Sequence, residues 1–246
     1  MNAENAIQLR LLDLQAADTA LAQLAHRRAT LPELAALAER EKRTESLHNE
    51  IVEAQTRAED IAAEQRRLEN DVDAVRAREA RDEQRLQAGG LPAKELESLQ
   101  HELTTLARRQ GTLEDELLEV MEQREDADSV LAGVVKQRDE LDAERGDLTA
   151  ARDVAFAEID AAIQQRTVER AAIATEIPAD LLALYERARG HSGGVGAAML
   201  RHRRCEGCHI ELSGSELASV RAAAPDEVVR CDNCRRILVR TAESGL

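Results

Sequence analysis

An apolar residue repeated on average every 3.5 positions is the feature of this sequence that most constrains its fold. From Leu96 to Ala162, alternating steps of three and four residues land on an apolar residue at fifteen of twenty positions, against 43% apolar residues in the whole chain. This spacing keeps one apolar stripe of a helix facing a partner helix. Because the register is kept along the whole stretch, it predicts a coiled coil.

A second repeat precedes the first and supplies the partner helix. From Leu47 to Leu86 the same steps give nine apolar residues out of twelve. The segment between the repeats, residues 88–92, contains two glycines that can end one helix and a proline that suits the first turn of the next. A turn at about 89–92 leaves arms of similar length, which favours an intramolecular antiparallel hairpin over a parallel dimer. Residues whose numbers sum to roughly 180 should then lie side by side.

The first arm should not be one continuous helix. Pro32, in the segment 30–33, would clash with the preceding helical turn. Its approximate partner across the hairpin is Gly146, a poor helix former. We therefore expect a kink where 30–33 faces Gly146.

The composition argues against a compact enzyme. The chain of 246 residues has one Tyr, one Phe and no Trp, whereas a globular core of this size normally uses aromatic side chains. Three histidines in the predicted hairpin, His26, His48 and His101, are isolated from other catalytic residue types. We expect no catalytic residues and no small-molecule substrate.

The net charge of −15 is unevenly distributed. Residues 1–198 carry 25 basic and 41 acidic side chains, whereas residues 199–246 carry 8 and 7. The acidic part should repel nucleic acids and anionic membranes. The start of the chain lacks the pattern of a signal peptide, and no apolar stretch approaches the ~20 residues that span a bilayer. We therefore expect a cytoplasmic protein with no membrane contact.

The four cysteines form two Cys-x-x-Cys pairs, Cys205 with Cys208 and Cys231 with Cys234. Two such knuckles bring four soft sulfur ligands into a tetrahedron, which suits a structural Zn²⁺ ion. In a reducing compartment this arrangement is favoured over two disulfides. The pattern predicts one structural zinc per chain, and zinc binding is the term that makes so small a domain fold.

Three alternative interpretations of this region stand beside a four-cysteine zinc site. A thiol–disulfide redox pair usually needs a surrounding α/β domain, which is absent here. An iron–sulfur cluster also uses four cysteines, although the symmetric knuckles favour zinc. His209, directly after the first knuckle, is a further ligand type, but a residue adjacent to a ligating cysteine usually points away.

Short strands and one helix should surround the knuckles. Apolar β-formers occur at 195–203, 228–230 and 237–239, and Ser213 followed by Glu216 can start a helix. Basic residues flank both knuckles and should form one basic face that can bind phosphates. The alternative is that these side chains balance the charge of the zinc–thiolate centre. The candidate nucleic-acid contacts are Arg201, Arg203, Arg204, Arg230, Arg235, Arg236 and Arg240, with His202 beside them.

The junction between the two regions starts at Pro178, which must end the return arm. A new helix should follow, and its apolar face includes Tyr185, the one tyrosine of the chain. We hypothesise that Tyr185 packs against the base of the hairpin near Ile7 and Leu11 and sets the angle of the ribbon. The glycine-rich stretch 190–196 should be a short flexible link.

Taken together, these segments resemble a bacterial family of long coiled-coil hairpins that end in a C4-type zinc ribbon. The resemblance rests on the tip at 91–100, the junction at 177–189, the first knuckle at 205–208 and the second knuckle with its following strand at 231–238. It implies that the four cysteines are zinc ligands and that the protein is not an enzyme. Family members look like regulatory or chaperone-like adaptors, some linked to an alternative sigma factor and to messenger RNA in flagellated bacteria. This chain has Leu96 where an aromatic residue is common in the family, so tip contacts do not carry over.

The sequence thus predicts a mainly α protein: a long kinked antiparallel coiled-coil hairpin followed by a small C-terminal zinc ribbon of short β-strands and zinc knuckles. We place the hairpin at 1–176, the junction helix at 177–190 and the C4 zinc ribbon at 191–246. Two functions stay open. One is an adaptor that binds a transcription- or chaperone-related protein, and the other is RNA or DNA binding through the basic face of the ribbon.

Overall fold

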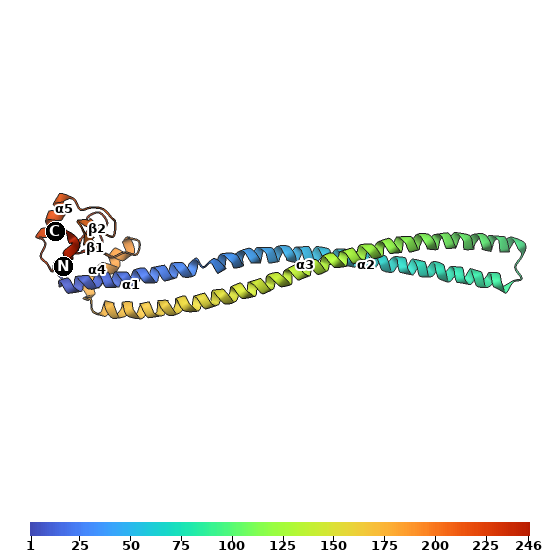
Figure 1. Ribbon diagram of the computed structural model, residues 1–246, viewed down its shortest axis with the longest axis horizontal. Helices are drawn as coiled ribbons and strands as arrows, with labels where there is room; N and C mark the ends of the chain where they lie inside the picture. Colours follow the sequence, from blue (N-terminus) through green and yellow to red (C-terminus); the bar gives the residue numbers. More distant parts are fainter. The chain divides into compact units, whose positions relative to one another are not determined.

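The structure, a computed structural model, describes residues 1–246 and is mostly helical (Figure 1). It divides into two compact units, one of residues 1–34 with 150–246 and the other of residues 35–149. No helix combines the length and the apolar character needed to cross a membrane. The elements in chain order are α1 (Asn5–Ala29), α2 (Pro32–Ala88), α3 (Ala93–Thr175), α4 (Ala179–His191), β1 (Ala197–Arg201), β2 (Arg204–Cys205), α5 (Gly214–Ala222), β3 (Val229–Arg230), β4 (Ile237–Val239) and the 3-10 helix η1 (Ala242–Ser244).

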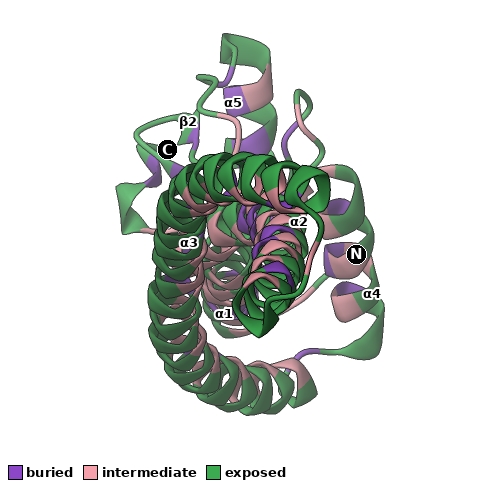
Figure 2. Ribbon diagram, turned by 90° about the vertical axis from the view of Figure 1, so that its right-hand side faces the viewer, coloured by how far each residue is buried: buried purple, intermediate pink, exposed green.

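In the unit of residues 35–149, α2 and α3 form the antiparallel hairpin that the sequence predicts. Leu68 and Val72 of α2 pack with Leu113 of α3 in one buried cluster, which confirms that residues far apart in the chain pair across the turn. The sides of both helices that face away from this seam are exposed (Figure 2). Gly89 and Gly90 of the turn have φ angles of 70° and 78°, a left-handed conformation that only glycine adopts readily.

Arginines at the seam pair with nearby polar side chains, as expected for long side chains that keep their charge in solvent. Arg145 contacts Glu41 of α2 at 2.7 Å, and Arg124 donates to the Oε1 atom of Gln65 at 3.0 Å. Exposed ion pairs of this kind contribute little, about 0–1 kcal/mol each. The apolar seam therefore supplies most of the stability of this hairpin.

The first arm is interrupted between α1 and α2, which end and begin at Ala29 and Pro32. The amide of Thr30 still bonds to the carbonyl of His26, and the helix is lost at Thr30 and Leu31. Pro32 follows as the first residue of α2, a position where a proline amide is not needed. On the return arm, α3 runs through Gly146 as a continuous helix. The kink at the level of Gly146 stays a prediction, as do the domain boundaries at 176 and 190.

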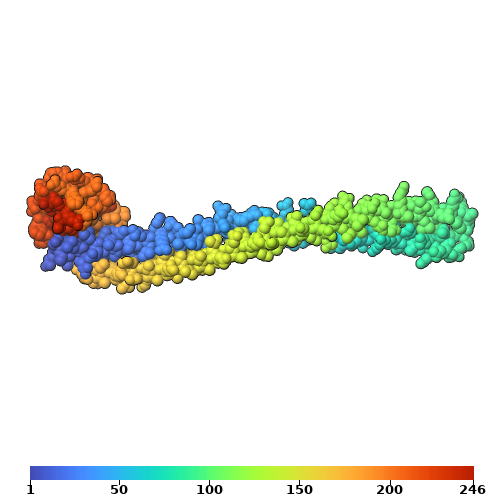
Figure 3. Space-filling model, viewed as in Figure 1, coloured from blue at the N-terminus to red at the C-terminus, as the bar shows by residue number.

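The other unit contains a four-stranded sheet of order β2-β1-β4-β3. β1 pairs in parallel with β4, and the two outer pairs are antiparallel. The start of the chain joins this region, because Ala3 donates to the Asp226 carbonyl at 2.7 Å and Asn2 bridges Glu227. The first residues of the chain accordingly lie against the C-terminal region in Figure 3. The ribbon and the chain start therefore pack as one body.

Tyr185 lies fully buried at the centre of this unit. It packs with Leu11 of α1 and with Ala197, Ile237 and Val239 of the sheet, and Ile7 covers the same cluster. This confirms the predicted contact of Tyr185 with the base of the hairpin. A Cβ atom on Gly196 would lie 2.7 Å from the Tyr185 carbonyl oxygen and 2.8 Å from its ring, so no larger residue fits here without a shift of the backbone.

A polar network surrounds the Tyr185 hydroxyl. The hydroxyl donates to the buried Asp18 carboxylate at 2.7 Å, and that carboxylate also binds Arg170 at 2.7 Å and Arg189 at 3.1 Å. The amide of Gly196 donates to the Gln15 side chain at 2.7 Å. Burial, together with the hydrogen bond to Asp18, raises the pKa of Tyr185.

The stretch 190–196 differs from the flexible link that we expected. α4 continues to His191, the amide of Gly194 bonds back to the Arg189 carbonyl at 3.0 Å, and Gly196 is held by Gln15. Both ends of the stretch are thus tied to helices by hydrogen bonds. The expectation of a free link was wrong because glycine here allows close approach and a positive φ angle at Gly194.

We predict that Leu113→Ala lowers the free energy of unfolding by about 2–5 kcal/mol, because Leu113 is only 1% exposed in the seam. The matched control is Leu118→Ala on the same helix, where the leucine is 60% exposed and the loss should stay within about 0.5 kcal/mol. Denaturant unfolding followed by the helical circular dichroism signal compares the two. Equal losses in both variants would contradict the seam assignment.

We also predict that Tyr185 resists ionisation in the folded protein. An unfolded tyrosine loses its proton near pH ~10, whereas the raised pKa keeps folded Tyr185 protonated above that pH. Its contribution to stability is therefore complete below pH ~10 and declines above it, by at most about 1.4 kcal/mol per pH unit. Because the chain has one tyrosine, tyrosinate absorbance reports this group alone. A folded-state midpoint near pH ~10, or an unchanged pH profile in Tyr185→Phe, would refute it.

Candidate metal centre

Two short knuckles bring the four cysteines together. Cys205 ends β2, Cys231 follows β3, and each is followed three residues later by the second cysteine of its pair. All four sulfur atoms lie within 4.8 Å of one another. Cys205 Sγ lies 3.8 Å from Cys234 Sγ, and Cys208 Sγ lies 3.9 Å from Cys231 Sγ. Each of these two sulfur–sulfur contacts therefore joins a cysteine of one knuckle to a cysteine of the other.

These distances fit one structural zinc ion. Four sulfurs around zinc at ~2.3 Å each form a tetrahedron whose edges measure about 3.8 Å. A disulfide would need sulfurs at ~2.05 Å, so the four thiols are not bonded to one another. With four sulfur ligands the ion would have no open coordination position, and its role would be to hold the two knuckles together.

The electrostatics of the thiols point the same way. Burial raises the pKa of Cys205 to about 12 and raises the pKa of Cys231. Burial alone would also raise the pKa of Cys234, but hydrogen bonds from the amide and side chain of Arg236 lower it to about 7. Thiols with raised pKa values stay protonated at neutral pH, so zinc binding would have to displace their protons and should weaken as the pH falls.

The two knuckles repeat one backbone conformation. His209 and Arg235, each directly after the second cysteine of a pair, have φ angles of 60° and 64°. Their amides bond to the carbonyls of Cys205 and Cys231 at 2.7 and 2.8 Å. The His209 side chain is exposed and is not among the groups that converge on the metal position. The geometry therefore favours the four-cysteine set over a histidine ligand.

The predicted strands and helix occur around the knuckles. Ser213 caps α5 by accepting a hydrogen bond from the Glu216 amide, while the Glu216 side chain accepts one from the Ser213 amide. Leu200, Leu212, Val220 and Leu238 pack in one cluster with Cys205 and Cys231. The metal position and the small ribbon core are therefore adjoining parts of one cluster.

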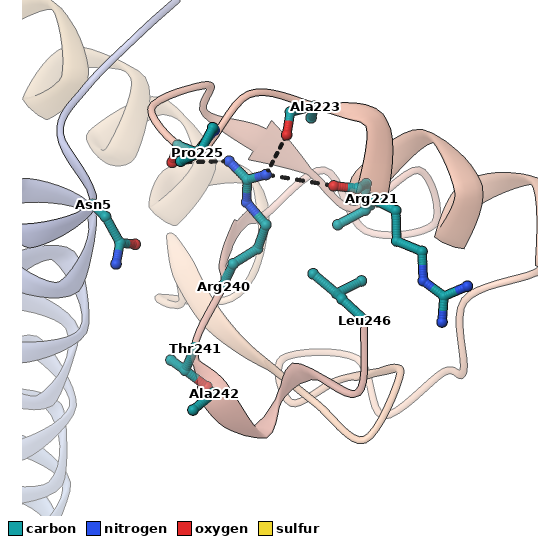
Figure 4. Close-up of a pocket in the computed structure, with 9 residues that line it drawn as sticks. Asn5, Arg221, Ala223, Pro225, Arg240, Thr241, Ala242 and Leu246 are labelled. Carbon is teal, nitrogen blue, oxygen red and sulfur yellow. Dashed lines mark hydrogen bonds between the residues drawn. The ribbon is translucent and has the colours of Figure 1, made fainter.

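The Arg240 side chain binds backbone carbonyls within the ribbon. Its guanidinium donates to the carbonyls of Ala223 at 2.9 Å, Ala224 at 2.6 Å and Glu227 at 2.7 Å, and so holds the end of α5 and the loop after it. Figure 4 shows this side chain directed at that loop, away from Leu246. These bonds occupy most of the donors that a phosphate would need.

The other candidate nucleic-acid contacts lie at separate places. Arg201 pairs with Glu243 at 2.7 Å, and the Arg235 side chain is exposed. The other four side chains donate to backbone carbonyls: Arg203 to Gly245, Arg204 to His209, Arg230 to Arg235, and Arg236 to Ser192 and Val195. Arg201 and Arg204 line one pocket, together with His202 and two glutamates, whereas Arg230 and Arg235 line another. Nucleic-acid binding by these residues stays a prediction.

Sequence reasoning missed two features of this region. The pairing of Asn2 and Ala3 with 226–227 left no pattern in the sequence, because a two-residue contact is too short to show periodicity. The placement of Arg187 and His191 beside Arg230 and Arg235 was also missed. A sequence signal did exist for it, since Arg187 and His191 are four residues apart and share one face of a helix.

We predict close to one zinc per chain and its loss in Cys208→Ser. Losing one ligand should release most of the ~10–16 kcal/mol that zinc gives such small domains, and the ribbon should become disordered. The helical signal should fall only slightly, since most helical residues lie in α2 and α3. Elemental analysis with thiol counting checks this, and purified protein without zinc but with two disulfides would refute it.

Comparison with known proteins agrees with this architecture. Residues 14–193 match the CT398-like coiled coil hairpin domain, and residues 204–238 match the C4-type zinc ribbon domain. An uncharacterized protein of Mycobacterium tuberculosis is 42% identical over 240 residues, with 98% of each chain covered. A solved structure from Mycobacterium smegmatis is 39% identical, with a TM-score of 0.88 over 98% of this chain and 100% of the other. CT398 from Chlamydia trachomatis has the same fold at 18% identity, with a TM-score of 0.69 over 96% of this chain and 98% of the other. The chain therefore belongs to the family of CT398-like coiled-coil hairpin proteins that carry a C4-type zinc ribbon.

Proposed function

We propose that the protein is a non-enzymatic adaptor that binds a protein partner through its helical hairpin and its zinc ribbon. The observation that carries the proposal is the closed character of the metal centre. The four thiols are the one group of three or more metal-ligating side chains that converges, and together they leave zinc no position for a substrate. The ion then stabilises a binding surface.

The division of the chain supports this role. The hairpin turn at 89–92 is mostly exposed, and the ribbon is a separate folded surface. A two-helix hairpin offers exposed helix faces for contact but no enclosed site for chemistry. The proposal places the protein in the cytoplasm, where cysteines stay reduced and available to zinc.

The class of partner rests on the resemblance described above. The segments 177–189, 205–208 and 231–238 resemble those of regulatory and chaperone-like adaptors, so we propose a transcription- or chaperone-related partner. A second candidate function is RNA or DNA binding by the ribbon. It is favoured by the charge balance of residues 199–246, where basic residues slightly outnumber acidic ones in an otherwise acidic chain.

The test is photo-crosslinking in cells from the full chain. We predict that a crosslinking residue in place of Leu91 at the turn, or of Arg235 at the ribbon, captures a discrete protein. The same residue in place of Glu119, an exposed position on α3, should capture little and serves as the control. Mass spectrometry identifies the adducts.

Salt and nuclease treatment separate the two candidate functions. Phosphate contacts weaken steeply with salt, so a nucleic-acid complex should be lost between ~50 and ~200 mM salt and should be sensitive to nuclease. A protein adduct that persists under both treatments supports the adaptor. Adducts that contain only nucleic acid would refute it.

A further inference from the structure

A pocket of about 460 Å³ lies between α4 and the second zinc knuckle. Leu184 and Ala188 of α4 form an apolar floor. Arg187 and His191 stand on the α4 side, and Arg230 and Arg235 stand on the knuckle side. The volume is within the range of sites that bind small ligands or peptide side chains, roughly 300–1,000 Å³. We call it the α4–knuckle pocket.

The arginines of this pocket have no carboxylate partner within the chain. Arg187, Arg230 and Arg235 form no ion pair, and no carboxylate lines the pocket. Arg230 uses only its Nε, which donates to the Arg235 carbonyl at 2.9 Å, so its terminal nitrogens stay available. By contrast, Arg170 and Arg189 in the same unit are paired with Asp18 and Glu186. In a chain with 48 acidic residues and a net charge of −15, three arginines gathered without a carboxylate point to an external anion.

The charge of a zinc–thiolate centre offsets only part of the charge of these arginines, although Cys234 itself lines the pocket. The Arg236 side chain is the one that hydrogen-bonds Cys234, and it also donates to the carbonyl of Ser192 at 2.6 Å. Arg187 belongs to α4 and not to a knuckle. A zinc ion with four thiolates would carry two negative charges, whereas Arg236 and the three pocket arginines carry four positive charges, so the excess is positive.

We propose that the α4–knuckle pocket binds an acidic segment of a partner protein, with an aliphatic side chain on Leu184 and Ala188 and its carboxylates against Arg187, Arg230 and Arg235. The proposal rests on the adaptor function and names the chemistry of its partner. Guanidinium groups bind carboxylates through paired, charge-assisted hydrogen bonds. An exposed arginine rim around an apolar floor suits a chain in which acidic and aliphatic residues alternate.

The same observations disfavour a nucleic acid in this pocket. The pocket offers no aromatic ring on which a base could stack. Arg236 and Arg240 are engaged with backbone carbonyls, and Arg201 and Arg204 line a different pocket that contains two glutamates. The arginines therefore do not form the continuous basic surface that a phosphate backbone would need.

The test measures fluorescence anisotropy of a labelled peptide with alternating glutamate and leucine, added to the full zinc-loaded chain. We expect saturable binding that weakens with salt and drops at least about tenfold in Arg187→Glu with Arg230→Glu, because two charge-assisted contacts are reversed. The matched control is Arg221→Glu, the same change of charge at an exposed arginine of another pocket. A peptide with lysine in place of glutamate should not bind.

Zinc content and the helical signal verify that the double variant is folded. If the charge-reversed variant lost its zinc, Arg187→Gln with Arg230→Gln replaces it. The expected loss of peptide affinity is then smaller, because the charges are removed and not reversed. Absence of binding by the acidic peptide, or equal affinity in the folded variants and in Arg221→Glu, overturns the proposal. Tighter binding of labelled oligouridine that is lost in the same variants also overturns it, as does salt-dependent self-association that needs these two arginines.

A failure of the pocket proposal can be distinguished from a failure of the adaptor function. If the crosslinked protein adduct persists unchanged in Arg187→Glu with Arg230→Glu, the pocket proposal is wrong and the adaptor stands. If the full chain captures no protein at either the turn or the ribbon, the adaptor function itself is wrong.

Discussion

The buried carboxylate of Asp18 is the interaction on which the arrangement of the ribbon-containing unit depends. It is only 4% exposed, and it is bound by Arg170 of α3, by Arg189 of α4 and by the hydroxyl of Tyr185. A buried charge is strongly unfavourable unless several donors surround it, so α1, α3 and α4 must all be in place at once. Gln15, one turn earlier on α1, extends this constraint to the start of β1 through Gly196. The network thus specifies a geometry in addition to any stability that it contributes.

Local patterns made the hairpin and the metal centre predictable from the sequence. The repeat through Leu113 needs only regular spacing, and the knuckles need only two residues between cysteines, so both features can be read without knowing the fold. The parallel pairing of β1 with β4 could not be read, because strands of five and three residues do not specify their neighbours. Asp18 was also hidden, since a charged residue on an amphipathic helix normally faces solvent. Tyr185 was recognisable because a lone aromatic in a chain of aliphatic residues has few places to be buried.

The two units form their buried cores with almost no aromatic residues, and they do so in different ways. In the unit of residues 35–149 a narrow seam suffices, and small residues such as Ala54, Ala58 and Ala127 let the helices approach closely where they are buried. The ribbon cannot use this solution, because its strands are too short to bury a continuous stripe. Its core instead includes Cys205 and Cys231, so a zinc ion would sit beside the same side chains that pack against Leu200 and Leu238. Metal binding and core formation are then a single event in the ribbon.

The α4–knuckle pocket depends on both of these constraints. Its floor belongs to α4, whose position is set by Tyr185 and Arg189 through Asp18, and its other wall belongs to the knuckle that zinc would hold. A ligand in the pocket would contact both walls, so it would bind best when the network and the metal centre are both intact. Since ligand binding stabilises the state that it recognises, an acidic partner would in turn favour the zinc-bound ribbon docked on α4. The hydrogen bonds that tie residues 194–196 to Arg189 and Gln15 are what would allow the two walls to act together, because a free link between them would let each move alone.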